Sequence, residues 1–194
     1  MTDAFTADAP PPGTYTLDPE RTTIRADVKA MFGLLTVHGT FRLRAGQVSI
    51  AADPGASSVQ ASIEAGSFAS GNTTRDADVV SASLLDAKAY PEITFTGQGA
   101  RREGDGWVVP GSVTAHGTAV PAEVRVSDAR LESGAARFRA TARLDRTSFG
   151  VTKKKGMVGR TVDLVIDAVA QPAEVGSLRF AVIAGMGYFA GRWA

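Results

Sequence analysis

The feature that most constrains the fold is a period-two alternation of apolar and polar residues, which returns in segment after segment. In residues 136–145 every second residue is apolar and the residues between them are polar. Residues 22–32 follow the same rule, with Ile24, Val28 and Phe32 on the apolar side. This period is typical of strands that turn one face to a core and the other to water. The chain is therefore predicted to be an antiparallel β protein.

Further alternating segments complete the predicted set of strands. They cover residues 41–44, 59–63, 93–100, 107–116, 122–129 and 162–168. Turn-forming clusters are predicted at residues 44–47, 103–106 and 132–134. Glycine supplies 21 of the 194 residues without a collagen period, which favours many tight turns between strands.

Eight or more strands that each have one apolar face must pack as a sandwich or close into a barrel. The apolar faces mix many alanines with a few phenylalanines. This mixture leaves room at the centre of an eight-stranded barrel for one small ligand. We therefore predict an all-β antiparallel barrel of about eight strands rather than a sandwich.

Residues 73–89 break the alternation and predict one short helix followed by a turn that ends at Tyr90-Pro91. Asn72 or Thr73 provides an N-cap, and Asp76 and Asp78 suit the positive end of the helix dipole. An irregular apolar stripe follows. We expect this helix to cover one end of the barrel.

The two ends of the chain differ from the alternating middle. Residues 1–13 lack lysine and arginine and end in a proline run, which predicts a disordered leader without a secretory signal and a cytoplasmic protein. Residues 14–171 are predicted to form the barrel domain, and residues 172–194 an apolar tail. The uncharged run at 180–191 is too short to span a bilayer. We expect it to pack on the domain or in a homodimer, with a peripheral membrane contact as the alternative.

Composition excludes several classes of function. With 21 basic and 20 acidic residues, the chain has no global field for nucleic acid. Without cysteine it has no thiol nucleophile or thiolate metal site, and the G-x-S-x-G and H-E-x-x-H motifs are missing. His38 and His116 lack a third ligand at a recognisable spacing, so we expect both to bond neighbouring backbone. We predict a protein that is not an enzyme and holds neither a metal nor another cofactor.

Several segments form an ordered set of motifs. They are GNTTRD at 71–76, followed by LD at 85–86 and YPEITF at 90–95, together with the segments at residues 17–18, 37–41, 109–117 and 145–151. Taken in order, over about residues 14–170, they resemble the YceI-like family of bacterial lipocalin-like proteins associated with polyisoprenoid binding. Family members typically carry His-Leu where this chain has Asp78-Val79, so no role of that histidine is carried over.

The resemblance implies an eight-stranded lipocalin-like barrel that encloses a long apolar tunnel for an isoprenoid chain. We therefore predict non-catalytic binding, storage or transport of an isoprenoid-type lipid, such as a polyprenyl phosphate or a quinone-like amphiphile. The predicted interior residues are Ile24, Val28, Phe32, Phe41, Ile63, Phe95, Val113, Phe138 and Leu144. The candidate headgroup residues are Arg75, Lys153, Lys154 and Lys155.

Each candidate has a structural alternative. The adjacent charges Arg75-Asp76 and Asp145-Arg146 are expected chiefly to fix loops through hydrogen bonds, and the three lysines to form a solvated loop. Two other functions stay open at this point. One is an interaction module whose barrel is filled by its own side chains and which acts through the tail. The other is a small enzyme that uses His38 or His116.

Overall fold

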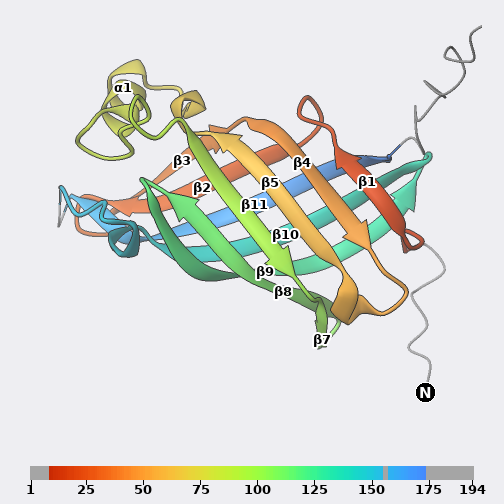
Figure 1. The fold of residues 1–194 in the computed structure, drawn as a ribbon. Helices are drawn as coiled ribbons and strands as arrows, with labels where there is room; N and C mark the ends of the chain where they lie inside the picture. The colour runs from red at the N-terminus through yellow and green to blue at the C-terminus, as the bar shows by residue number, and fades with distance from the viewer. Residues whose placement is uncertain (1–8, 155–156, 174–194) are drawn as a thin grey trace, which may run out of the picture.

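The fold is taken from a computed structural model that describes residues 9–154 and 157–173 (Figure 1). Eight antiparallel strands close a barrel in the order β1, β4, β5, β6, β8, β9, β10 and β11, and β11 returns to pair with β1. These strands are β1 (Gly13–Leu17), β4 (Leu43–Ile50), β5 (Ser58–Glu64), β6 (Glu92–Gln98), β8 (Gly106–Ala115), β9 (Thr118–Glu132), β10 (Ala135–Asp145) and β11 (Val158–Pro172). The predicted barrel is confirmed.

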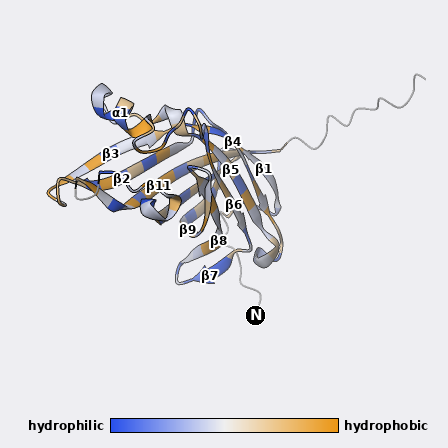
Figure 2. Cartoon of the chain, turned by 60° about the vertical axis from the view of Figure 1, so that its left-hand side comes forward, coloured by the Kyte–Doolittle hydropathy of each residue, from blue (hydrophilic) through white to orange (hydrophobic). Residues whose placement is uncertain are grey.

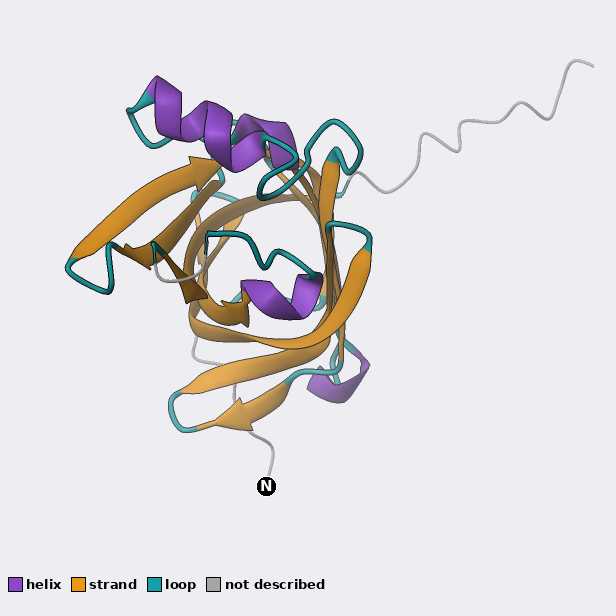
Figure 3. Cartoon of the chain, turned by 90° about the vertical axis from the view of Figure 1, so that its left-hand side faces the viewer, coloured by secondary structure: helices purple, strands orange, loops and turns teal. Residues whose placement is uncertain are grey.

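A hairpin branches from the barrel wall because β11 is long enough to have two partners on one side. Its last residues pair with β1, where Leu17 faces Ala170. Its earlier part pairs with β2 (Thr23–Ala30), which continues into β3 (Leu35–Phe41). Figure 3 shows this hairpin leaning away from the closed ring. The short strand β7 (Arg101–Glu103) pairs with β8 at the other end of the barrel.

The helix α1 (Thr73–Val80) lies over the end of the barrel from which the hairpin projects (Figures 1 and 3). Asn72 is its N-cap, because the Asn72 Oδ1 atom accepts a hydrogen bond from the backbone N of Arg75 at 3.0 Å. Turns follow the helix over residues 81–89, as predicted. Three 3-10 helices complete the described structure: η1 (Pro54–Ala56), η2 (Ala65–Ser67) and η3 (Arg146–Phe149).

One predicted turn is wrong. Residues 44–47 lie inside β4, which passes a register shift after Leu43 and continues straight on. A Cβ atom on Gly46 would lie 2.4 Å from the Leu17 Cδ1 atom and 2.9 Å from the Gln60 carbonyl oxygen. The glycine therefore permits a close approach of neighbouring strands instead of a change of chain direction. The turns at 103–106 and 132–134 occur as predicted.

The outer wall of the barrel is polar and carries pairs of opposite charge across neighbouring strands. Arg139 and Asp167 approach to 2.7 Å, and Arg143 and Asp163 to 2.6 Å. Such exposed pairs contribute little to stability, but they keep this face in water and leave the inner face to the apolar residues. Figure 2 shows the alternation along the strands.

The described chain begins at residue 9, ahead of the barrel boundary expected at residue 14. Pro10 is buried, and Gly13 already belongs to β1. The Tyr15 hydroxyl donates a hydrogen bond to the carbonyl oxygen of Pro11 at 2.7 Å. Residues 1–8 and the tail from 174 lie outside the described residues. Within the described part of the chain, no helix combines the length and apolar character needed to cross a membrane.

Candidate functional site

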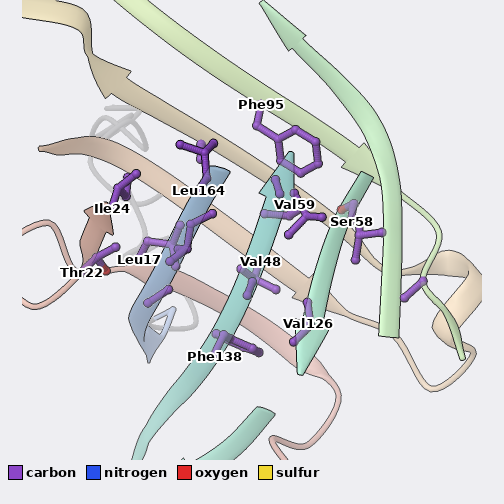
Figure 4. Close-up of a pocket in the computed structure, with 18 of the residues that line it drawn as sticks. Leu17, Thr22, Ile24, Val48, Ser58, Val59, Phe95, Val126, Phe138 and Leu164 are labelled. Atoms are coloured by element: carbon purple, nitrogen blue, oxygen red, sulfur yellow. The ribbon is translucent and has the colours of Figure 1, made fainter. Parts of the chain in front are cut away.

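The barrel encloses an apolar cavity of about 230 Å³, called here the deep cavity. Side chains from opposite walls point into it, among them Phe95, Val126 and Phe138 (Figure 4). It reaches the end of the barrel remote from α1, where Pro54 and Ala100 line it. None of the described residues that line the deep cavity carries a charge.

Small side chains create this space. Ala140 and Ala142 of β10 and Ala168 of β11 are buried and line the deep cavity. Successive residues of a strand alternate between the two faces, so every second position of β10 points inward. Because alanine is so short, these positions leave the centre of the barrel open. The interior is therefore hollow, contrary to the alternative of a barrel filled by its own side chains.

A second cavity of about 750 Å³, called here the mouth cavity, lies at the end that carries α1. Its walls come from the β2–β3 hairpin, α1 with the turns after it, and the segment between β10 and β11. Six residues line both cavities, so the two cavities adjoin each other along the barrel: Ile24, Ile63, Ile93, Val113, Leu144 and Leu164.

The mouth cavity differs from the deep cavity in its charged groups. Arg75 and Asp78 from α1, Arg146 from η3 and Lys154 from the following loop all line it. The two adjoining cavities are thus uncharged at one end of the barrel and ionic at the other. Such a combination suits an amphiphile, whose chain and headgroup need different surroundings.

Eight of the nine residues predicted for the interior line one or both cavities. Phe32 does not, and its predicted interior position is wrong. Its side chain is 84% exposed at the tip of the β2–β3 hairpin. Strand β2 ends at Ala30, and the backbone then enters the left-handed region at Met31 and Phe32, with φ of 49° and 58°. The alternation of the strand therefore stops before it reaches Phe32.

Arg146 organises the loop at the mouth. It is only 8% exposed, and its guanidinium donates four hydrogen bonds to backbone carbonyl oxygens. The acceptors are Val151 at 2.6 Å, Gly159 at 2.7 Å, Val158 at 2.8 Å and Lys153 at 3.0 Å. Burial lowers the pKa of Arg146. This arginine therefore fixes both sides of the loop between η3 and β11.

The neighbouring Asp145 caps η3. Its Oδ1 atom accepts hydrogen bonds from the Thr147 backbone N at 2.9 Å and hydroxyl at 2.6 Å, while its Oδ2 atom lies 2.5 Å from Arg160 Nη2. The Arg160 hydrogen bond, followed by those from Thr147, lowers the pKa of Asp145 to about 2. The pair Asp145-Arg146 thus fixes a loop. Asp145 caps η3, and Arg146 donates hydrogen bonds to backbone carbonyl oxygens of the loop.

Replacing Asp145 with asparagine should flatten the acid dependence of stability. The pKa of Asp145 falls from an ordinary 3.8 to about 2 on folding. Its stabilising effect is therefore present above pH 3.8 and is lost as the pH falls toward 2. Thermal unfolding between pH 5 and pH 2 measures the difference between the native protein and D145N, which should be largest near pH 5 and shrink in acid. A difference independent of pH would contradict the role assigned to the carboxylate.

The pair Arg75-Asp76 fixes the entry to α1. The Asp76 Oδ1 atom accepts hydrogen bonds from the Ser70 backbone N at 2.9 Å and hydroxyl at 2.5 Å. The Arg75 Nε atom donates to the same hydroxyl at 2.8 Å. Arg75 is therefore held in place while it lines the mouth cavity.

The lysine loop reaches toward the helix. Lys154 forms an ion pair with Asp78, and the Lys153 Nζ atom lies 3.4 Å from the carbonyl oxygen of Ala82. Of these two lysines, Lys154 lines the mouth cavity. The third candidate, Lys155, lies outside the described residues. Asp78 occupies the position where family members typically carry histidine, and here it joins the helix to the lysine loop.

The two histidines lie apart from the cavity linings. The His38 Nδ1 atom is 2.7 Å from Asp27 Oδ1, and the His116 ring stacks at a tilt on Tyr90 with centroids 4.8 Å apart. Burial acts to raise the pKa of Asp27, but hydrogen bonds from His38 and Arg25 outweigh it and lower the pKa. Among residues 9–154 and 157–173, no group of three histidine, cysteine or acidic side chains is placed to hold a metal ion.

Sequence reasoning left out several lining residues. Val48, Val124, Val126 and Ile166 line the deep cavity, and the same alternation that marked their neighbours would have found them. Phe68, which lines the mouth cavity, gave no such signal because it follows η2 and belongs to no strand. Its ring occupies the space beside Gly39, where a Cβ atom would lie 2.2 Å from it.

Comparison with known proteins agrees with this geometry. The sequence matches the YceI-like domain over residues 15–170. It is 31% identical over 160 residues to the UPF0312 protein of Pseudomonas putida, a match that covers 78% of this chain and 83% of the relative. It is 26% identical over 140 residues to Protein YceI of Escherichia coli O6:H1, covering 69% and 73% of the two chains.

Solved structures share the fold. The crystal structure of Burkholderia cenocepacia BcnA superposes with a TM-score of 0.72 at 24% identity, over 80% of this chain and 99% of BcnA. A polyisoprenoid binding domain from Saccharophagus degradans, implicated in plant cell wall breakdown, superposes with a TM-score of 0.63 at 15% identity, over 81% and 98%. The barrel, the ordered motifs and these matches together show that the chain belongs to the YceI-like family.

Proposed function

We propose that the chain binds an isoprenoid-type lipid, such as a polyprenyl phosphate or a quinone-like amphiphile, and stores or transports it. The observation that carries this proposal is the pair of adjoining cavities along the barrel, of which the deep cavity is lined by uncharged residues and the mouth cavity carries charged groups. The hydrocarbon chain would occupy the deep cavity, and the headgroup would stay at the mouth.

Burial of the hydrocarbon chain supplies the affinity. Each CH₂ group transferred from water to an apolar site contributes about 0.8 kcal/mol, so a few isoprene units suffice. A deep cavity without an occupant would also deprive its lining atoms of dispersion contacts. No reacting side chain is needed, and neither His38 nor His116 is among the described residues that line the two cavities. We therefore propose a binding protein that does not catalyse a reaction.

The charges at the mouth favour a phosphate or another electron-rich headgroup. Arg75 and Lys154 face the mouth cavity, and Asp78 is the acidic residue beside them. The Arg146 guanidinium is already engaged by four carbonyl oxygens, and Lys154 is paired with Asp78. Arg75 is therefore the first cation for a headgroup, and Lys154 contacts the headgroup by exchanging Asp78 for it. Lys153 and Lys155 are proposed only as secondary contacts, since Lys153 is not among the described lining residues.

The relatives support the ligand class. The structural neighbour from Saccharophagus degradans is described as a polyisoprenoid binding domain, and this chain shares its fold. The cytoplasmic location expected from the N-terminal residues stays a prediction.

Native mass spectrometry of protein purified without detergent, followed by organic extraction, tests the proposal. We expect one bound lipid per chain, and a prenyl chain in the extract. If the protein is empty, added polyprenyl phosphate and ubiquinone should each be offered in turn. A chain that is empty and takes up neither compound would rule out the proposed function.

A further inference from the structure

The tip of the β2–β3 hairpin exposes large apolar side chains in an unbroken cluster. Phe32 is 84% exposed and Leu34 is 81% exposed. Single exposed apolar residues are ordinary on a protein surface, whereas contiguous ones indicate an interaction site. Figure 2 shows the hydrophobic colour at this outermost point of the hairpin.

The cluster continues into the mouth cavity. Met31, Leu35 and Met157 are between 51% and 60% exposed, and all three also line that cavity. The Met31 backbone N donates a hydrogen bond to the Met157 carbonyl oxygen at 2.9 Å, which ties the hairpin to the segment before β11. Apolar surface therefore extends without interruption from the tip into the barrel.

The backbone of the tip is held in an uncommon conformation. Met31, Phe32 and Gly33 follow one another in the left-handed region, with φ of 49°, 58° and 89°. Bulky residues seldom adopt this conformation, and it tends to persist where function depends on the local geometry. Because of this backbone conformation, Phe32 does not face the interior, although the alternation of apolar and polar residues predicts that it would.

The sequence around the apolar tip is basic. Residues 28–37 and 151–160 together contain five lysines and arginines and no aspartate or glutamate. Lys154 and Arg160 form ion pairs with Asp78 and Asp145, whereas Lys29 and Lys153, among the described residues, form none. Lys29 stands on β2 beside the tip, with its Nζ atom 2.9 Å from the Thr36 hydroxyl. A second copy docked here through the same face would bring like charges together, which is unfavourable. Anionic lipid headgroups complement the charge, and their acyl region accepts the apolar side chains.

We propose that the hairpin tip, defined as Met31, Phe32, Leu34 and Leu35 together with Met157, docks on a bilayer that contains anionic lipids. Phe32 and Leu34 enter the interfacial region, and the nearby lysines contact headgroup phosphates. Docking turns the mouth cavity toward the membrane. The docking itself is independent of the proposed cargo, whereas passage of a lipid from membrane to barrel rests on the proposed function.

Co-sedimentation with vesicles tests the docking. The vesicles are of phosphatidylcholine alone or of phosphatidylcholine with a minority of phosphatidylglycerol. We expect the native protein to bind the mixed vesicles more strongly, and the double variant F32S/L34S to bind them about tenfold more weakly or worse. High salt should also weaken binding of the native protein.

The variant L131S is the matched control. Leu131 is also exposed, at 42%, but it lies near the β9–β10 turn. That turn packs beside Ala170 of β11, whereas the hairpin tip lies beside Val158 at the opposite end of the same strand. L131S should bind vesicles as the native protein does. Equal losses in the two variants, or no binding by the native protein, would overturn the proposal.

Two further outcomes would also overturn it. If F180S/F189S in the tail abolishes vesicle binding while F32S/L34S does not, the membrane contact lies in the tail. If the native protein sediments as a dimer that F32S/L34S dissociates, the tip binds a second copy. The variant F32S/L34S should still take up a short-chain prenyl ligand from solution, which shows that its barrel is intact. This measurement distinguishes a loss of docking from a failure of the proposed function.

Discussion

Replacing Ala140 with phenylalanine should weaken lipid binding roughly a hundredfold while the barrel stays folded. Ala140 is 5% exposed and points into the deep cavity from β10, so the new ring would occupy the path of the hydrocarbon chain. Excluding about four CH₂ groups costs ~3 kcal/mol of binding free energy, which corresponds to roughly a hundredfold weaker binding. Titration with a prenyl ligand, followed by tryptophan or ligand fluorescence, measures the loss.

The variant Thr141→Phe is the matched control, because Thr141 is the next residue on the same strand and faces solvent. It introduces the same ring outside the barrel and should leave affinity unchanged. Thermal unfolding of both variants checks the fold, since an oversized side chain in a packed interior typically costs about 1–3 kcal/mol, and the open space here reduces that cost. Native affinity in a folded A140F protein would show that the deep cavity does not hold the ligand.

Replacing Arg146 with methionine should destabilise the protein by roughly 3 kcal/mol. Methionine keeps much of the apolar stem but removes the donors that bond four backbone carbonyl oxygens. Buried acceptors that lose their partner cost free energy, and hydrogen bonds from charged donors are the stronger kind. Urea denaturation compares the free energies of unfolding.

Arg143→Met supplies the control for Arg146→Met. Arg143 lies on β10, shortly before η3, and its Nε atom is 2.6 Å from Asp163 Oδ1, but its side chain is 76% exposed. Loss of such an exposed pair should cost less than about 1 kcal/mol. Similar losses for R143M and R146M would mean that the carbonyl network around Arg146 contributes nothing beyond an ordinary surface arginine.

The site was predictable where it depends on local periodicity. The inward residues of β10 are every second residue from Ala136 to Leu144, and the alternation by itself indicates that Phe138 and Leu144 face the interior. The helix N-cap at Asn72 follows equally from local chemistry. By contrast, the turn predicted around Gly46 is wrong. Glycine stands there because a Cβ atom would collide with Leu17 on another strand.

The loops at the mouth were likewise predictable only where neighbouring residues determine them. Adjacent charges at Asp145-Arg146 indicated a fixed loop, and the hydrogen bonds show one. The carbonyl oxygens that Arg146 bonds belong to residues 151–153 and 158–159. The residue spacing alone does not specify that these carbonyls meet at Arg146. Its partners could therefore not be predicted from the sequence.

By itself, the amino-acid sequence determined which face of each strand is apolar, and hence that the strands must enclose a shared interior. That information is local, because the side-chain period of a strand is set by its own backbone. Whether the interior is full or hollow depends on how many strands close the ring and which small residues meet across it. The exposed Phe32 also depends on pairing, since β11 has room for both β1 and β2 and so sends the hairpin outside the ring. These features arise from contacts between residues far apart in the chain, and only the closed barrel brings those residues together.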